Sequence, residues 1–125
     1  MCQMIDKEYT TRRKRELKAK GVKRIKCWKQ IVVESTGDRM HTPWVWAWVT
    51  PGWNKAKGML EISDYEVSAG ACHLYTKKEA NCIPVYVCVK DIIKFGNIYS
   101  GGGKDVTVSK YFIYKQDYDE RIERE

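Results

Sequence analysis

Over most of the chain, apolar residues alternate with polar ones, and this period of two predicts β-strands. Ile25, Cys27, Ile31 and Val33 share one face of a first predicted strand, whereas Trp28 falls on the other face. The turn residues Ser35-Thr36-Gly37-Asp38 follow. Residues 40–50 are therefore predicted to form a second strand that pairs antiparallel with the first.

Short apolar runs bounded by turn residues predict further strands downstream. These runs are residues 59–62, 65–67, 71–75, 85–89, 91–95 and 105–114. In the last of them, Val106, Val108, Phe112 and Tyr114 are predicted to share one face. Thr76-Lys77-Lys78-Glu79 fits a capping box, which predicts a short helix that ends at Asn81.

The N-terminal segment lacks this alternation and predicts a helix over residues 6–20. Asp6 or Thr10 can serve as its N-cap, and Gly21 is placed for a C-terminal cap. Because few apolar residues line this helix, we expect it to lie on the surface of the domain or to order when a partner binds. Its apolar stripe consists of Ile5, Tyr9 and Leu17.

Together these elements predict an α+β domain, with a basic N-terminal helix followed by a mainly antiparallel sheet of five to seven strands and one short inserted helix. The 125 residues suffice for one core. The predicted parts are a basic helix or arm (1–23), a β-rich domain (24–114) and an acidic tail (115–125). No apolar run approaches the roughly 20 residues that span a bilayer, and the first residues lack a secretory signal. We expect a cytoplasmic protein with no membrane partner.

Positive charge is concentrated at the N-terminus. Residues 1–30 hold eleven basic and three acidic residues, a net charge of +8, against +7 for the whole chain. Such a cluster is typical of phosphate binding, although a solvated helix or an arm for an acidic protein partner would carry the same charges. The candidate contacts for nucleic acid or an acidic partner are Arg12, Arg13, Lys14, Arg15, Lys18, Lys20, Lys23, Arg24 and Lys26.

Tryptophans form a second candidate site. Trp44, Trp46 and Trp48 alternate along the predicted second strand, and Trp28 lies on the strand before it, where it could stand opposite them. An aromatic row on a sheet face can stack nucleic-acid bases or form a protein interface, and it can equally be the core, which we favour for this row. Trp53 completes the aromatic candidates.

The cysteines and histidines predict neither a metal site nor a catalytic site. No C-x-x-C pair occurs among the five cysteines, so we expect no zinc or other cofactor, and Cys27, Cys72 and Cys88 are predicted to be small buried residues. His73 with Tyr75 could serve a small nucleotide-directed enzyme, but a structural histidine is the more frequent case. We therefore expect a protein that is not an enzyme.

One resemblance adds a biological setting. Pro51-Gly52-Trp53-Asn54-Lys55-Ala56, followed by Gly70-Ala71-Cys72-His73-Leu74-Tyr75 with Glu79-Ala80, resembles small proteins of bacteriophages and prophages that share a W-P-G-W-N-x-A turn and a later G-x-H-x-[YF] strand. The resemblance covers about residues 24–114 and transfers no catalytic or binding residue. It implies an accessory protein of a mobile element, a setting in which small proteins that block host machinery are common.

The charge and the resemblance predict a non-enzymatic module that binds nucleic acid or a nucleoprotein complex. In a phage setting it would inhibit a host defence or nucleic-acid-processing system. The main alternative is a protein–protein inhibitor or homo-oligomeric structural protein, for instance a homodimer, that uses a Trp-rich sheet face.

Overall fold

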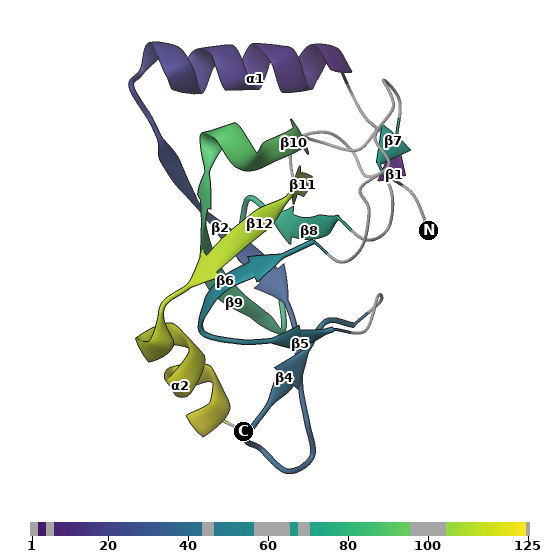
Figure 1. Ribbon diagram of the computed structural model, residues 1–125, viewed down its shortest axis with the longest axis vertical. Coiled ribbons are helices and arrows are strands. Elements are labelled where there is room, and N and C mark those ends of the chain that lie inside the picture. The colour runs from purple at the N-terminus through teal and green to yellow at the C-terminus, as the bar shows by residue number, and fades with distance from the viewer. Residues whose placement is uncertain are drawn as a thin grey trace.

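The computed structural model describes residues 3–4, 7–43, 47–56, 66–67, 71–95 and 105–124. In this part of the chain two α-helices accompany a seven-stranded and a three-stranded antiparallel sheet, so the fold is α+β (Figure 1). The elements follow in the order β1 (Gln3–Met4), α1 (Lys7–Ala19), β2 (Arg24–Gln30), β3 (Val32–Val33), β4 (Met40–His41), β5 (Trp48–Val49), β6 (Gly52–Lys55), β7 (Glu66–Val67), β8 (Cys72–Tyr75), β9 (Cys82–Cys88), the 3-10 turn η1 (Val89–Asp91), β10 (Ile92–Phe95), β11 (Asp105–Val108), β12 (Lys110–Ile113) and α2 (Lys115–Glu123). β1 pairs with β7 apart from both sheets.

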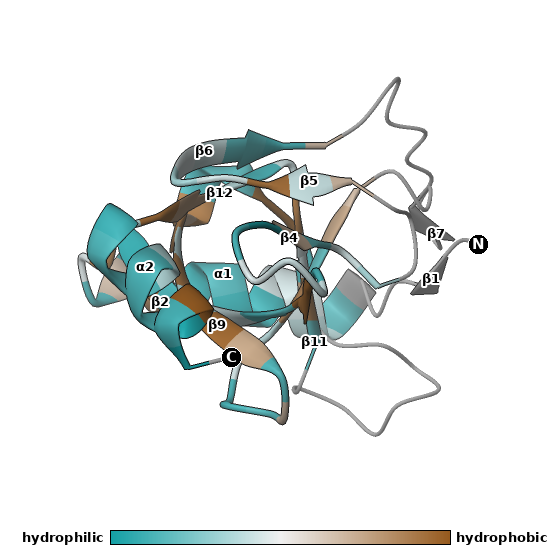
Figure 2. Ribbon diagram, turned by 90° about the horizontal axis from the view of Figure 1, so that it is seen from below, coloured by the Kyte–Doolittle hydropathy of each residue, from teal (hydrophilic) through white to brown (hydrophobic). Residues whose placement is uncertain are grey.

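The seven-stranded sheet rolls up on itself. Its strand order is β10-β11-β8-β2-β9-β12-β6. Because only Ser109 separates β11 from β12, one continuous stretch of chain pairs with β8 through its first half and with β9 through its second. Both β8 and β9 pair with β2, so these strands surround a common interior (Figure 2).

The core fills this interior. The alternating strand residues point inward, and the predicted strand over 85–89 is confirmed as part of β9. Figure 2 shows the most hydrophobic residues on the strands, whereas α1 and α2 are largely hydrophilic. The inward-facing residues of the sheet include Cys27, Leu74, Val85, Val87, Val106, Val108, Tyr111 and Ile113, all of them buried.

The predicted single strand over residues 40–50 is wrong. Met40 pairs with Val49 and His41 with Trp48, so the chain doubles back, and β3, β4 and β5 form the small sheet. The turn at 35–38 is confirmed, with Gly37 at a φ of 74° donating its N–H to Glu34 O. Trp28 does not stand opposite this segment, because it pairs with Pro84 of β9 and Tyr75 of β8.

The predicted face of residues 105–114 is also wrong beyond Ser109. Val106 and Val108 point inward as predicted, but Tyr111 and Ile113 are the buried residues of β12. At Ser109 the N–H bonds to Asp91 O and the carbonyl accepts from Ala56, which breaks the alternation. A shift of one residue moves every later side chain to the other face, so Phe112 and Tyr114 lie on the outside of the sheet.

The predicted N-terminal helix is confirmed as α1, which ends as its glycine predicts. Gly21 has a φ of 70°, its N–H bonds to Lys18 O and that of Val22 to Leu17 O, which is a Schellman motif. Thr10 is not an N-cap, since it lies inside the helix and its hydroxyl bonds the backbone of Phe95 in β10. The side chain of Leu17 joins the core.

Two further helical segments differ from the predictions. Residues 76–81 form a bend, an irregular stretch and a turn instead of a helix, and Asn81 has a φ of 60°, outside the right-handed helical region. The inserted helical turn is η1, which follows β9 instead of preceding it.

The predicted acidic tail forms α2, where Tyr118 and Ile122 pack against the core. No helix in the described ranges is long and apolar enough to cross a membrane.

Candidate nucleic-acid interface

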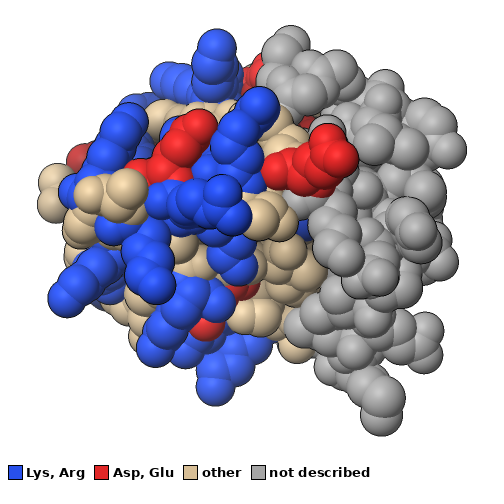
Figure 3. All heavy atoms as spheres, turned by 90° about the horizontal axis from the view of Figure 1, so that it is seen from above, with Lys and Arg blue, Asp and Glu red and all other residues tan. Residues whose placement is uncertain are grey.

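Basic side chains gather over α1 and the residues that follow it. Viewed onto α1, the surface carries many Lys and Arg side chains and few acidic ones (Figure 3). Helix α1 runs across the end of the rolled sheet, so its outer face points away from the core (Figure 1). The exposed cations of this region are Arg12, Arg15, Lys18, Lys20, Lys23, Arg24 and Lys26.

Two predicted contact residues of α1 hold the helix to the domain. Lys14 donates its Nζ to the carbonyl of Ile92 at 2.7 Å. Arg13 forms an ion pair with Glu16 at 3.2 Å and its guanidinium lies 5.9 Å from the centroid of the Phe95 ring. Both side chains are half-buried. The outward cations therefore come from the remaining positions.

An open cleft lies between α1 and the loop after β8. It contains cations from both sides, because Arg12 and Arg13 come from the helix and Lys77 from the loop. Glu16 is the acidic residue in its lining, and it pairs with Arg13. The complete lining is Tyr9, Arg12, Arg13, Glu16, Thr76, Lys77 and Phe95.

Strand β2 continues the basic surface from α1 onto the sheet. Arg24 and Lys26 point outward and are exposed, and Lys26 Nζ lies 4.9 Å from the centroid of the Trp28 ring. Lys78 approaches the same ring at 5.8 Å. Cations over an aromatic face are attracted by its negative π-cloud, so Trp28 sits in a cationic surrounding.

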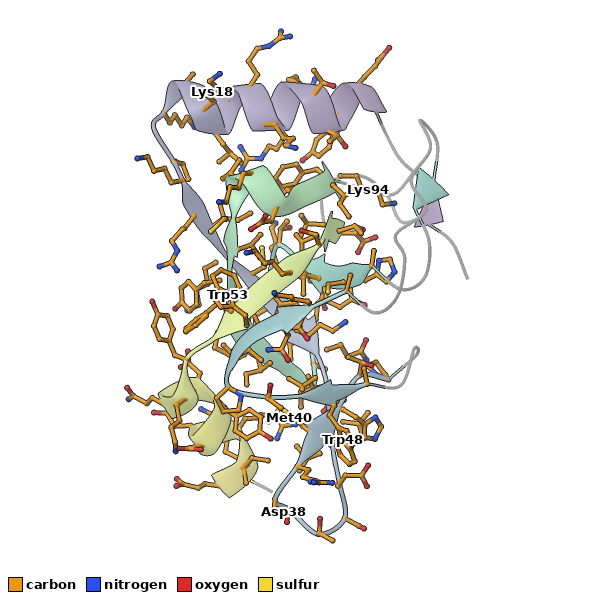
Figure 4. The ribbon with its side chains drawn as sticks, viewed as in Figure 1. Lys18, Asp38, Met40, Trp48, Trp53 and Lys94 are labelled. Atoms are coloured by element: carbon orange, nitrogen blue, oxygen red, sulfur yellow. The ribbon has the colours of Figure 1, made fainter. Side chains whose placement is uncertain are left out.

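The predicted aromatic candidates separate into two places. Trp28 and Trp53 lie on the outer face of the large sheet, whereas Trp48 lies in β5 of the small sheet. Figure 4 shows Trp53 at the left, at mid-height of the molecule, and Trp48 lower and farther right, near Met40. Trp44 and Trp46 lie outside the described residues.

Three aromatic residues that the sequence analysis did not select join Trp53. Phe112 pairs with Trp53 on one side and with Tyr86 on the other. Ring centroids are 5.3 Å apart for Trp53 and Phe112, 5.1 Å for Phe112 and Tyr114, and 5.0 Å for Tyr86 and Tyr114, each pair in an edge-to-face arrangement. We call Trp53, Phe112, Tyr86 and Tyr114 the aromatic platform.

The turn before β6 fixes Trp53 in this position. Gly52 has a φ of 92°, and Pro followed by a glycine of positive φ is typical of a type II turn. Asn54 closes the turn from inside, because its amide accepts from Thr50 N at 3.1 Å and donates to Thr50 O at 2.8 Å. Asn54 points in and is buried, so its neighbour Trp53 must point out.

Cations border the platform on the side of its strands, whereas the acidic helix α2 begins directly after Tyr114. Lys110 pairs with Lys55 beside the pair formed by Phe112 and Trp53, and Lys110 Nζ lies 4.6 Å from the centroid of the Trp53 ring. None of the strands β2, β9, β12 and β6 contains Asp or Glu. We call Arg24, Lys26, Lys55 and Lys110 the basic margin.

Two other lysines are buried and do not contribute to this surface. Lys29 lies on the inward face of β2 and donates a hydrogen bond from its Nζ to His73 O at 2.9 Å. Lys94 of β10 has no exposed area. Burial lowers the pKa of both side chains, and that of Lys94 falls to about 8 although Asp105 opposes the shift.

His73 and Tyr75 lie on one face of β8 but have separate partners. His73 Nδ1 lies 3.3 Å from Thr107 Oγ1, and Tyr75 donates its hydroxyl to Gln30 at 3.4 Å. Burial, together with the charges of Lys29 and Lys94, lowers the pKa of His73 to about 4. The imidazole is therefore neutral at physiological pH.

The four cysteines that the structure describes lie mainly in the interior. Cys27 and Cys72 are buried as predicted, and so is Cys82, whereas Cys88 is half-buried on the outer face of β9. Burial raises the pKa of Cys27 to about 12 and that of Cys72 to about 11. Within the described ranges, no three His, Cys, Asp or Glu side chains cluster as metal ligands would.

Comparisons with known protein families, with curated proteins and with solved structures found no match to this chain.

Proposed function

We propose that this protein is a non-enzymatic module that binds nucleic acid, free or within a nucleoprotein complex, through α1 and the start of β2. The observation that carries this proposal is the concentration of exposed cations along one continuous stretch of the surface, from Arg12 to Lys26. Each phosphate that such cations neutralise releases condensed counterions, which supplies binding free energy without a base-specific contact.

The geometry of α1 supports this role. The helix is held to the domain from its inner face by Thr10, Lys14 and Leu17, so its outward cations have fixed relative positions. A ligand that binds them does not have to order the helix first, and the entropic cost of binding is correspondingly lower. In the setting of a phage or prophage, a module of this kind would act in the host cytoplasm and block a defence or nucleic-acid-processing complex.

The test is a titration of the full chain with a labelled duplex and a labelled single strand at about 50 and about 200 mM salt. We expect binding that weakens steeply as salt rises. Lys18→Ala should weaken binding and reduce the salt slope by about 1, since Lys18 lies in the exposed last turn of α1. Arg124→Ala removes the same charge beyond the end of α2 and should change neither. Absence of binding at the lower salt concentration overturns the proposal.

A protein–protein interface is the second candidate, and the small sheet favours it. Val32 and Trp48 are both opposite His41 in β4, and their side chains are 42% and 40% exposed. Exposed apolar side chains of this size on one face of a sheet, here with His41 between them, are typical of interfaces. A discrete dimer in light scattering that Trp48→Ala abolishes, together with no affinity for nucleic acid, would favour this candidate.

A further inference from the structure

The aromatic platform is the largest described group of contacting rings on the molecular surface. Trp53 and Tyr114 are 41% and 44% exposed, and both contact the half-buried Phe112. Tyr114 also contacts Tyr86, which is half-buried. Rings that contact each other on the surface form a continuous apolar patch. Such a patch favours aggregation unless it serves as a binding site. The platform is therefore a candidate binding surface.

The local backbone places these rings outward by two independent devices. At the β6 end, the buried Asn54 and the positive φ of Gly52 turn Trp53 out. In β12, which lies between β9 and β6, the shift at Ser109 turns Phe112 and Tyr114 out while Tyr111 and Ile113 fill the core. The outward orientation of Trp53, Phe112 and Tyr114 is thus determined by the fold.

The charges around the platform identify the class of ligand. Strands β9, β12 and β6 of the platform and the neighbouring β2 carry the basic margin and no acidic residue, and the acidic side chains of α2 follow only beyond Tyr114. Lys110 lies over the outer ring, Trp53, and Lys26 is paired with Tyr86 across β2 and β9. A ligand that fits this surface has flat apolar groups joined by negative charges at short intervals. A nucleic acid with unpaired bases has this chemistry.

We infer that the aromatic platform stacks the bases of single-stranded nucleic acid while the basic margin contacts its phosphates. This inference rests on the proposed function and specifies its ligand. Bases inside a duplex are already stacked, so only unpaired bases can place a π-face against Trp53 or Tyr114. The strand β2 joins the two surfaces, because its first residue, Arg24, follows directly on the basic segment after α1.

The experiment compares two tryptophans that differ in place and little else. Trp53 is 41% exposed with Lys110 at 4.6 Å from its ring, and Trp48 is 40% exposed with Arg39 at 4.5 Å. Full-length wild type, Trp53→Ala and Trp48→Ala are titrated with labelled oligothymidine, oligouridine and a DNA duplex of equal length at low salt. Oligothymidine and oligouridine separate a DNA ligand from an RNA ligand.

We expect Trp53→Ala to weaken single-strand binding roughly tenfold, and to leave duplex binding unchanged. Trp48→Ala should change neither. Trp53→Phe, which keeps a π-face, should restore most of the single-strand affinity, and its rescue would exclude a general folding defect. Tyr114→Ala, which removes a second exposed ring of the platform, should also weaken single-strand binding.

The inference is overturned if Trp53→Ala binds both single strands as the wild type does, or if it loses single-strand and duplex binding in equal measure. In either case salt-dependent duplex binding would still support the proposed function. If the wild type binds neither the single strands nor the duplex at low salt, the proposed function itself fails.

Discussion

Thr10 makes a buried polar contact between α1 and the sheet. Its Oγ1 donates to Phe95 O at 3.1 Å and accepts from Phe95 N at 2.9 Å, and both residues are buried. Phe95 belongs to β10, an edge strand of the large sheet. One edge of β10 pairs with β11, and at Phe95 the other edge forms hydrogen bonds with Thr10 of α1. Thr10→Val keeps the shape of the side chain and removes both hydrogen bonds.

The expected cost is about 2–4 kcal/mol. Each hydrogen bond contributes about 1 kcal/mol, and the backbone groups of Phe95 that remain buried without a partner add to the loss. A helix of 13 residues is marginally stable in water on its own, so α1 should lose its order when it separates from the sheet. A loss of 2 kcal/mol corresponds to roughly thirtyfold faster amide exchange in α1 and at Phe95.

The assay combines urea unfolding with amide hydrogen exchange of the native protein. Thr10→Ser retains the hydroxyl and should cost less than about 1 kcal/mol, the value of one buried methyl group. Thr11→Val makes the same change at the exposed neighbouring position and should stay within about 0.5 kcal/mol of the wild type. The reasoning is refuted if Thr10→Val is as stable as Thr11→Val and α1 keeps its protection from exchange.

Three further predictions concern other parts of the fold. Gly52→Ala should lower the free energy of unfolding by about 1–2 kcal/mol in urea titrations, because an alanine is strained at a φ of 92°. The pKa of His73 is about 4 in the folded protein and 6.5 when unfolded, so the unfolded chain binds the extra proton between these values. The wild type should therefore lose stability relative to His73→Gln as the pH falls from 6.5 to 4, and parallel curves would contradict this. The thiol of Cys27, buried and with a pKa of about 12, should react with iodoacetamide only at the rate of unfolding, as peptide mass spectrometry would measure.

The sequence predicts those parts of the fold in which local pattern and burial agree. Residues 85–89 are β-branched at alternate positions, and Val85 and Val87 are fully buried in β9. Gly21 ends α1 because only the left-handed conformation allows the Schellman motif that closes the helix. The α+β class follows from such segments, since each of them needs no information from the rest of the chain.

The errors arise where both faces of a segment are apolar. In residues 105–114, Phe112 and Tyr114 are as apolar as Tyr111 and Ile113, so alternation cannot tell which pair is buried. The backbone bonds of Ser109 decide it, and their partners, Asp91 and Ala56, are distant in the sequence. The aromatic platform could not be found from the sequence for this reason.

Other errors had a local signal that was not used. Tyr118 and Ile122 are four residues apart in the acidic tail, which is the spacing of one helix face, and both pack against the core in α2. The alternation in β2 likewise places Lys29 on the face of Cys27, where it is buried and donates to His73 O. A buried lysine contradicts the usual rule for charged residues, and only its carbonyl partner explains it.

The basic surface of α1 and its connection to the aromatic platform both depend on the contact that holds α1 to β10. Helix α1 keeps its outward cations in place through Thr10 and Lys14, which bond the backbone of β10, and the segment after the helix leads directly into β2. If the platform and the helix bind one strand together, Thr10→Val should weaken nucleic-acid binding although Thr10 is buried and cannot touch the ligand. Thr10 carries no charge, so the substitution removes no phosphate contact directly. The slope of log affinity against log salt concentration should therefore decrease only by the share that the cations of α1 contribute, and the share of the cations on β2 should remain. An unchanged affinity in a variant whose helix exchanges freely would mean that α1 takes no part in binding.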